Sequence, residues 1–386
     1  MPRILLLTAG FGEGHNTAAR CIAEALGEQS DAECRVVDVY LKTLPRFTKV
    51  LQSGYGLAIN KFPFIWNAIF SALDKPGLLE ATLPLAGNLR EAVRRAVDEF
   101  HPDVVVSTYP LYSYLIRELR KMGHSASAVP LLTMVTDSTA INTSWYRAGS
   151  EYFLLADEET AEVLRQGGAD PATLQVLGFP VAPRLASLKP SESVIHGARR
   201  VLYLPSSRIG HTVAVIRELQ KLPQIEITVV TGRLKGLHQA IAKSCVIDGV
   251  RTHLVGWTDK IPELLCSHHL YIGKAGGAIV HEAMAARCPI LVSHVVPGQE
   301  EGNIELIERH DIGRLAAHYP APLAASVAEV FANHEATWKR WKKNLASISR
   351  PGASRDIATF ILKASIRSQG HSASEQIISA DQFRLH

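Results

Sequence analysis

Short runs of consecutive apolar residues alternate with longer stretches of helical periodicity along the first half of the chain. The apolar runs lie at residues 3–10, 103–110, 131–137 and 152–157. Strands of a parallel sheet are apolar in this continuous way, because helices cover both faces of the sheet. We therefore expect a doubly wound α/β domain in this half of the chain.

The same alternation starts again after a polar stretch at residues 188–196 that is rich in Lys, Pro, Ser and Glu. Five more apolar runs follow, at residues 201–205, 227–232, 252–257, 270–277 and 289–295. Two doubly wound, Rossmann-like domains in tandem are the simplest account. We expect an N-terminal domain, a C-terminal domain, a helix that crosses back to the first domain and a loose tail, at residues 1–187, 198–350, 351–368 and 369–386.

Composition and charge limit the class of protein. The 386 residues are 47% hydrophobic and 20% charged, as in an ordinary globular protein, and the net charge of +4 is too small to indicate general nucleic-acid binding. The five cysteines form no CxxC pair, which argues against a disulfide framework or a zinc site. Residues 1–15 run from an apolar stretch into a glycine-rich turn without a basic leader, so we predict a first strand rather than a signal peptide, and a cytoplasmic protein.

The first chemical motif is TAGFGEGHNTAA at residues 8–19, between the first expected strand and a helix expected to begin near Asn16 or Thr17. Glycines in such a turn let the backbone approach a ligand closely. His15 could accept a proton from a substrate hydroxyl, because imidazole titrates near neutral pH. The alternative is a tight turn with an incidental histidine.

The second motif, YIGKAGGAIVHEAMA at residues 271–285, predicts a strand, a Gly276–Gly277 turn and a helix. Backbone amides at a helix N-terminus bind phosphate oxygens, and Glu282 could accept hydrogen bonds from both hydroxyls of a ribose. The next expected strand leads into a loop with groups suited to a sugar, namely Gln299, Glu300 and Asn303. Ordinary helix capping is the alternative for either segment alone, and their succession disfavours it.

Residues 41–75 mix five basic residues and several aromatic residues with a single acid. Polar residues and a proline interrupt the apolar part, which favours a segment in the lipid headgroup layer over a membrane-spanning helix. The expected membrane contacts are Lys49, Lys61, Phe62, Phe64 and Trp66. A pair of aromatic-rich core helices is the alternative.

Together these motifs resemble a known family. They are GFGEGH followed by AA near the N-terminus, VTDSTAINTSWY, GFPVAPRL, VGW, GKAGGAIVHEAMA and PGQEEGN. In this order they are similar to the monogalactosyldiacylglycerol synthase and processive diacylglycerol glucosyltransferase family. The chain is more distantly similar to the bacterial transferase that adds N-acetylglucosamine to the muropeptide lipid carrier. The resemblance implies a GT-B architecture, in which an acceptor domain and a UDP-sugar domain face a cleft, and metal-independent inverting transfer.

The resemblance also implies roles for individual residues. His15 matches the proposed general base, and Asp137 with Trp145 matches an element near the acceptor. The donor-site matches are Gly14, Gly256, Trp257, Thr258, Lys274, Gly276, Gly277, Glu282, Gln299, Glu300 and Asn303. Among them, Trp257 and its two neighbours stand where the family lines the uracil pocket, although Trp257 could also be a core aromatic.

The chain departs from the family pattern at three places. Ala182 replaces an arginine that contacts phosphate, and Arg184 stands two positions later. The usual Gly-Gly-Ser loop of the second domain is PSSRIG here, and its candidates for donor binding are Ser206, Ser207 and Arg208. Asn142 occupies the place of a histidine in plant members.

The expected function is therefore transfer of a hexose from a UDP-sugar to a membrane lipid hydroxyl, above all that of diacylglycerol. The expected partners are the UDP-hexose co-substrate, a lipid acceptor and an anionic membrane surface on the inner face of the cell membrane, with no nucleic acid, metal or further cofactor. Glucose and galactose remain alternatives for the sugar. N-acetylglucosamine transfer to a lipid-linked peptidoglycan precursor, a UDP-sugar 2-epimerase and a catalytically silent binding protein remain alternatives for the function.

Overall fold

The structure is a computed structural model that describes residues 1–10, 13–43, 78–124, 126, 128–138, 141–191, 197–295 and 300–366. The five expected membrane contacts, Lys49, Lys61, Phe62, Phe64 and Trp66, lie outside these residues, and so does Gln299. The chain divides into two compact units, Met1–Pro183 with Gly352–His386, and Arg184–Pro351.

The first unit is built on a parallel six-stranded sheet with the order β2-β1-β3-β4-β5-β6. Its strands are β1 Arg3–Thr8, β2 Glu33–Asp38, β3 Val104–Ser107, β4 Leu131–Met134, β5 Tyr152–Leu155 and β6 Leu174–Val176. Its helices are α1 Glu13–Gln29, α2 Val39–Thr43, α5 Leu78–Thr82, α6 Gly87–Phe100, α7 Pro110–Lys121 and α8 Glu158–Gln166, with short 3-10 turns η1 Leu83–Ala86, η3 Thr143–Trp145 and η4 Pro171–Thr173, and η5 Pro183–Ala186 at the boundary of the units.

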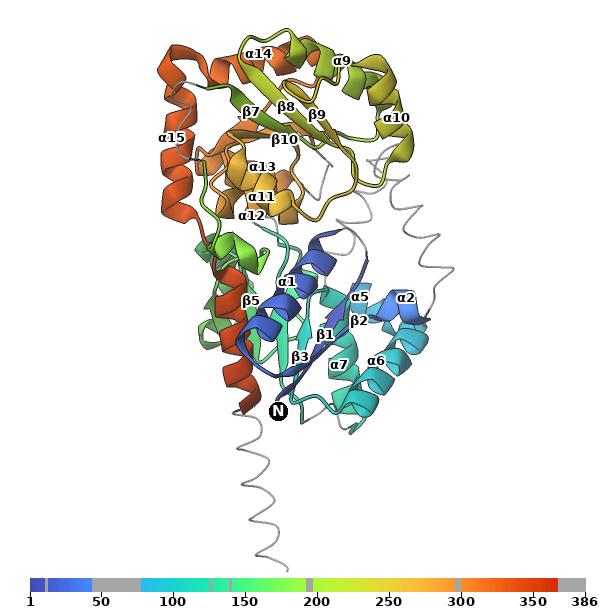
Figure 1. Cartoon of the computed structure of the whole chain (residues 1–386). Helices are drawn as coiled ribbons and strands as arrows, with labels where there is room; N and C mark the ends of the chain where they lie inside the picture. Colours follow the sequence, from blue (N-terminus) through green and yellow to red (C-terminus); the bar gives the residue numbers. More distant parts are fainter. Residues whose placement is uncertain are drawn as a thin grey trace, which may run out of the picture. The chain divides into compact units, whose positions relative to one another are not determined.

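Both faces of this sheet are covered, as the continuous apolar runs predict. Leu5 and Leu7 of β1 belong to the core formed with α6 and α7, whereas Ile4 and Leu6 pack with α1 and the helical residues 353–366 (Figure 1). Successive side chains of a strand point to opposite faces, and each fully buried aliphatic side chain contributes about 1.5–3 kcal/mol. The last described part of the chain therefore belongs to the first unit.

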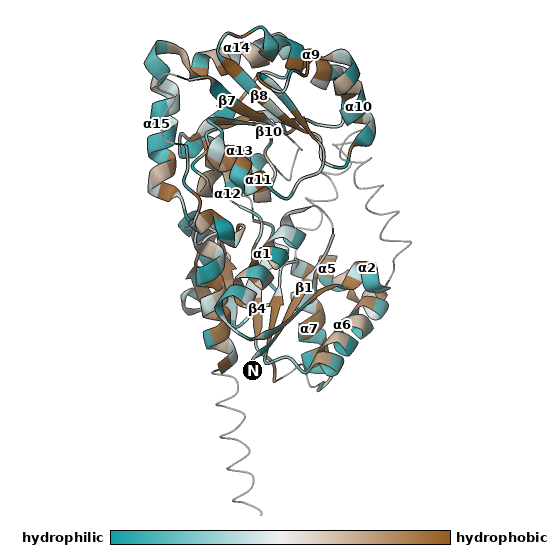
Figure 2. Ribbon diagram, viewed as in Figure 1, coloured by the Kyte–Doolittle hydropathy of each residue, from teal (hydrophilic) through white to brown (hydrophobic). Residues whose placement is uncertain are grey.

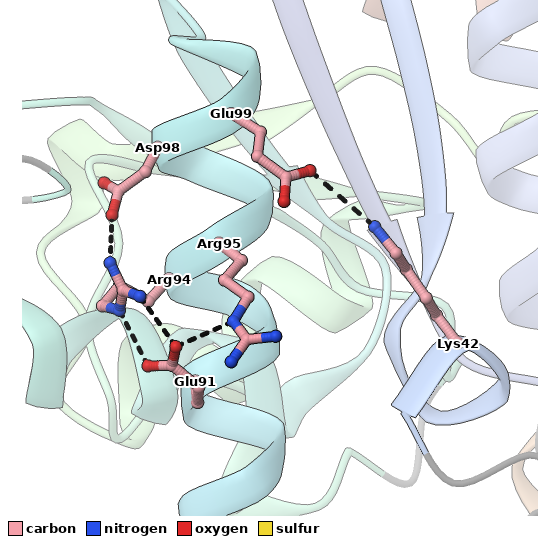
Figure 3. Close-up of polar contacts among 6 residues, drawn as sticks. All are labelled: Lys42, Glu91, Arg94, Arg95, Asp98 and Glu99. Carbon is pink, nitrogen blue, oxygen red and sulfur yellow. Dashed lines mark hydrogen bonds and ion pairs between the residues drawn. The ribbon is translucent and has the colours of Figure 1, made fainter.

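The outer face of α6 is held by ion pairs (Figure 3). Arg94 lies 2.7 Å from Glu91 and 2.5 Å from Asp98, one turn away on either side. Lys42 of α2 lies 4.0 Å from Glu99, so an ion pair connects the short helix α2 to α6. Each exposed pair of this kind contributes only about 0.3–0.5 kcal/mol.

The second unit repeats the design, with the strand order β12-β11-β10-β7-β8-β9. Its strands are β7 Arg199–Tyr203, β8 Ile225–Val230, β9 Thr252–Val255, β10 Leu270–Lys274, β11 Ile290–His294 and β12 Gly313–Leu315. Its helices are α9 Ile209–Gln220, α10 Lys235–Ser244, α11 Ile261–Ser267, α12 Gly277–Ala285, α13 Glu301–Arg309, α14 Pro320–Val330 and α15 Ala332–Ile348. In Figure 1, α9, α10 and α14 cover one face of this sheet and α11, α12 and α13 the other.

Two parallel, doubly wound sheets confirm the predicted fold class. Figure 2 shows the apolar strands enclosed by helices whose outer faces are polar. The sequence analysis missed β2, β6 and β12. β6 and β12 have three residues each and β2 has six, and all three include exposed or half-buried positions. Since β2 and β6 lie at the edges of the first sheet and β12 at an edge of the second, their sequences lack a continuous apolar run.

One predicted boundary is wrong, because α1 begins at Glu13 rather than near Asn16 or Thr17. The glycine-rich turn is therefore shorter than expected, and His15 stands within the first turn of the helix. Among the described helices, none has the length and apolar character needed to cross a membrane.

Candidate functional site

His15 lies at the carboxyl end of the first sheet, where α1 begins. Its Nδ1 is 2.7 Å from the Thr136 hydroxyl, which follows β4. Burial lowers the pKa of His15 to about 4, and a hydrogen bond with the Thr108 backbone opposes this shift. The imidazole is therefore neutral at pH 7 and able to accept a proton.

Asp137 and Trp145, which the family resemblance associates with the acceptor, lie beside His15. The indole Nε1–H of Trp145 donates to Asp137 Oδ2 over 2.7 Å, and the Trp145 ring is 5.9 Å from the His15 ring. Burial raises the pKa of Asp137 to about 6, and the hydrogen bond from Trp145 opposes this shift. Residues from two distant parts of the sequence thus form one cluster in the first unit.

Asn142 helps to fix Trp145 in place. Its side chain accepts a hydrogen bond of 3.0 Å from the Ser144 backbone and caps the turn η3, which contains Trp145. In this chain, therefore, Asn142 has a structural role.

An apolar pocket of about 380 Å³ adjoins this cluster. It is lined by Tyr40, Leu79, Thr82, Leu85, Ala86, Asn88, Leu89, Tyr109, Pro110, Leu111 and Ser144. Tyr109 belongs to both sites, because its ring packs edge-on against His15 at 5.2 Å. Tyr40 of α2 and Leu79 of α5 come from the helices on either side of residues 44–77, which include most of the predicted membrane segment and lie outside the described residues.

The sequence analysis missed this pocket. Its lining comes from four separate segments of the chain, and their apolar residues resemble ordinary core positions. The one signal was Tyr109–Pro110, an aromatic residue and a helix start immediately after the apolar run that forms β3.

In the second unit, β10 ends at Lys274, and Gly276 precedes α12. The N-cap residue is a glycine, which offers no capping side chain, and amides in the first turn of a helix can bind an anion. A Cβ atom at Gly276 would lie 3.3 Å from Lys274 Cε, a tight contact that the flexible lysine side chain could relieve. Gly277 begins α12, and Glu282 lies buried on its second turn.

Glu300 and Asn303, from the start of α13, pack against the same turn. Glu300 is buried, with Oε1 3.7 Å from Lys274 Nζ. Asn303 donates from Nδ2 to the Ala275 carbonyl over 2.8 Å, while its buried Oδ1 has no hydrogen-bond partner among the described residues. A buried acceptor without a partner costs free energy, and a hydroxyl group of a ligand would satisfy it.

Trp257 lies in the loop after β9, between Gly256 and Thr258. Its side chain is 61% exposed, so it is not a core aromatic, and the Arg233 guanidinium lies 5.5 Å from the ring centroid. An added Cβ at Gly256 meets nothing within 4 Å, whereas the Thr258 hydroxyl accepts a hydrogen bond from the Lys260 backbone. The exposed ring has a free surface on which a base could stack.

The two candidate replacements for the missing arginine differ in their surroundings. Arg184 is held by an ion pair of 2.9 Å with Glu263 and by the Asp259 carbonyl. Arg208 is exposed in the loop after β7, next to Ser206 and Ser207, and its Nη1 lies 3.4 Å from His318. Arg184 thus contacts the loop after β9 and the start of α11, whereas Arg208 lies in the loop after β7, so both are near the carboxyl end of the second sheet.

Gly14 lies next to His15 in the first turn of α1. An added Cβ there meets nothing within 4 Å, so the space above this turn is open.

Comparison with known proteins gives a consistent result. Residues 15–181 match the family model of monogalactosyldiacylglycerol (MGDG) synthase. The chain is 24% identical over 374 residues to the processive diacylglycerol beta-glucosyltransferase of Bacillus subtilis, covering 94% of this chain and 95% of the relative. It is also 24% identical over 372 residues to the chloroplastic monogalactosyldiacylglycerol synthase of Spinacia oleracea, covering 91% of this chain and 70% of the relative.

Among solved structures, the UDP-GlcNAc 2-epimerase from Neisseria meningitidis superposes with a TM-score of 0.58 at 14% identity, covering 94% of this chain and 100% of that one. A likeness at this identity shows a shared fold and does not separate a transferase from an epimerase. The fold is that of the GT-B proteins, and the chain is homologous along nearly its whole length to processive diacylglycerol glucosyltransferases and monogalactosyldiacylglycerol synthases, which confirms the resemblance carried by its motifs.

Proposed function

We propose that this protein is an inverting glycosyltransferase that moves a hexose from a UDP-sugar to the hydroxyl of diacylglycerol. Its relatives are named for glucosyl or galactosyl transfer to this lipid. The observation that carries the proposal is the contact of Tyr109 with both His15 and the apolar pocket. A lipid alcohol needs this combination, because its hydroxyl must reach a proton acceptor while its chain stays out of water.

In the proposed reaction, the lipid hydroxyl gives its proton to the neutral imidazole of His15. Its oxygen forms a bond to the anomeric carbon as the bond from that carbon to the UDP oxygen breaks. One displacement from the face opposite UDP inverts the anomeric configuration. The products are the glycolipid, UDP and a protonated His15, which returns the proton to solvent.

A pKa of about 4 makes free His15 a weak base at pH 7, although it keeps the imidazole neutral. Negative charge from the donor would raise the pKa of His15, because an imidazolium is stabilised by a nearby anion. We infer that His15 becomes an effective base only when donor and acceptor are both bound.

For the donor, Trp257 is proposed to stack on the uracil and Glu282 to accept hydrogen bonds from the ribose. The free amides at the start of α12 are assigned to the diphosphate, since the helix dipole favours negative charge there. Asn303 Oδ1 is assigned to a sugar hydroxyl.

We further propose that the protein acts at the inner face of the cell membrane. The support is the basic and aromatic composition of residues 41–75, together with the position of Tyr40 and Leu79 in the pocket on either side of this segment.

The test is to incubate purified protein with vesicles that contain diacylglycerol and, separately, UDP-glucose or UDP-galactose, with EDTA present. We expect a hexosyl-diacylglycerol, detected by mass spectrometry, whose NMR coupling shows the β configuration. Release of UDP without glycolipid would reject the lipid acceptor. Conversion of a UDP-sugar to its 2-epimer would replace the transferase assignment by an epimerase.

A further inference from the structure

Three histidines that no role above uses gather at the carboxyl end of the second sheet. His211 lies in the first turn of α9, His294 is the last residue of β11, and His318 follows β12. The rings of His211 and His318 stack with centroids 4.8 Å apart and planes at 10°, and the His294 ring is 6.4 Å from that of His318. With Arg208, whose Nη1 is 3.4 Å from His318 Nε2, they form what we call the histidine cluster.

The charges that act most strongly on this cluster are cationic. Burial and then the repulsion of His318 and Arg208 lower the pKa of His211. Burial, followed by repulsion from Arg208, His318, Lys274 and His211, lowers the pKa of His294. Lys274 is itself paired with Glu300 at 3.7 Å, and the ring next to His318 on the chain is the Tyr319 phenol, 6.2 Å away.

Basic groups without a nearby carboxylate repel one another unless an anion joins them. A metal ion fits poorly, because stacked rings do not direct their nitrogens to one point and the Arg208 guanidinium would repel a cation. In the described part of the chain, no three His, Cys, Asp or Glu side chains are arranged to hold a metal. Both Arg208 and His318 are exposed, so an anion can reach the cluster from solvent.

The position of the cluster indicates which anion it binds. Arg208 and His211 lie at the start of α9, and the Arg208 side chain forms no cap there, so first-turn amides and the helix dipole add to the positive field. The loop after β7 and the ends of β10 and β11 lie on neighbouring strands, because the sheet runs β11-β10-β7. In an open α/β sheet, ligands bind at the carboxyl ends of such strands.

We propose that His211, His294 and His318, with Arg208, bind the diphosphate of the sugar-nucleotide donor, and that His211 and His294 take up protons as it binds. This inference rests on the proposed function, since it assigns the three histidines and a new property to the donor site. Burial and the neighbouring cations favour the neutral form of free His211 and His294, and the bound diphosphate makes their imidazolium form favourable. Donor affinity therefore depends on pH through histidines that do no chemistry on the sugar.

The sign of the dependence follows from linkage. A ligand that raises the pKa of a group binds more tightly where that group can be protonated and loses affinity as pH rises. We expect the affinity for a UDP-sugar to fall between about pH 6 and pH 8, by up to about tenfold per pH unit for each proton taken up.

The experiment is isothermal titration of the full chain with UDP-glucose, UDP-galactose and uridine at several pH values, in buffers of different ionisation enthalpy. The diphosphate of a UDP-sugar is a diester that does not titrate near neutral pH. Any protons taken up on binding are therefore bound by groups of the protein. We expect net proton uptake with the UDP-sugar that binds more tightly and none with uridine, whose affinity should not change with pH.

Two kinds of variant separate the effect of a positive charge on donor affinity from the effect of proton uptake. His211→Gln should weaken UDP-sugar binding by about tenfold at pH 6.5 and reduce proton uptake. His211→Lys carries a fixed charge, so it should restore affinity while proton uptake stays low. His334→Asn is the matched control, because His334 is exposed on α15 with a left-handed backbone that asparagine accepts, and it should change neither quantity.

The outcomes are distinguishable. UDP-sugar binding without proton uptake, or uptake that His211→Gln leaves unchanged, would overturn the role of the histidine cluster and leave the proposed function standing. Failure of both sugar nucleotides to bind would overturn the proposed function, and this inference with it. Tighter binding of Zn²⁺ than of a UDP-sugar, lost in His211→Gln, would show that the cluster is a metal site instead.

Discussion

The candidate sites of the two units perturb the pKa values of their titratable groups through different neighbours. Around His15 and Asp137 the perturbation is burial among aromatic rings, which favours the neutral form of both groups. Burial is also the first cause at His294, and repulsion from Arg208, His318, Lys274 and His211 lowers its pKa further. A site that removes a proton from a lipid alcohol needs a dry, neutral base, whereas a site that binds a diphosphate needs positive charge. The physical environment thus distinguishes acceptor chemistry from donor binding within one fold type.

The strongest way to break this comparison is His15→Ala. We expect turnover to fall by about 10²–10⁴-fold, the usual contribution of a positioned general base, while UDP-sugar affinity stays within about twofold. Transfer rates with diacylglycerol vesicles and titration with the UDP-sugar are the measurements. A comparable loss of donor affinity would mean that His15 belongs to the donor site and that the division between the units is wrong.

The apolar pocket tests the acceptor side without touching the base. Leu85 lines the pocket but is 88% exposed, so Leu85→Glu should fold normally. A lipid chain that packs on Leu85 gains about 1.5–3 kcal/mol, so the variant should raise KM for diacylglycerol by about tenfold or more. Val250→Glu, at a 69% exposed position of the second unit, is the control and should leave KM unchanged. Equal KM values in the two variants would show that the pocket does not bind the acceptor.

The apolar pocket illustrates what the sequence could not predict. The alternation of apolar runs predicted the strands of both sheets except β2, β6 and β12, because a short, continuous apolar run between helical stretches is typical of a strand buried on both faces. The motif around His15 and the D-x7-W element were each found as separate segments. Their meeting through Thr136, Tyr109 and the Asp137–Trp145 hydrogen bond depends on the order of strands in space, which the sequence does not state.

The histidine cluster illustrates the same limit in the second unit. His294 stood at the end of a predicted strand, but His211 and His318 are separated from it by many residues. His318 follows β12, an edge strand whose half-exposed residues give no clear pattern. Only the pairing of β11 with β12 brings His318 near His294. The donor motif itself was found because its glycines and Glu282 lie in one continuous segment.

The pH profile sharpens the comparison further. Asp137 has a pKa of about 6, raised by burial, so its carboxylate form prevails above that pH and is lost below it. If the charged form is needed to hold Trp145 beside His15, kcat/KM for the acceptor should fall by up to about tenfold per pH unit below pH 6. Donor must be saturating, because donor affinity is expected to change in the opposite direction. For Asp137→Asn we expect a lower maximal kcat/KM and no further fall below pH 6. An unchanged fall below pH 6 in this variant would show that another group causes it.

The smallest expected effect on donor binding is that of Arg94→Gln, which we compare with Arg208→Gln at a second surface arginine with different neighbours. Arg94 lies between the carboxylates of Glu91 and Asp98, so its charge is already compensated within the helix. Arg208 faces the ring of His318. We expect Arg208→Gln to weaken UDP-sugar binding by about tenfold. Arg94→Gln should leave binding and turnover unchanged and lower the free energy of unfolding by no more than about 0.5–1 kcal/mol, measured by urea denaturation.

A loss of donor affinity in Arg94→Gln equal to that in Arg208→Gln would show that net charge governs binding. Unequal effects would show that an arginine marks a ligand site when its neighbours leave its charge uncompensated, which is the property that distinguishes the donor region from the rest of the charged surface.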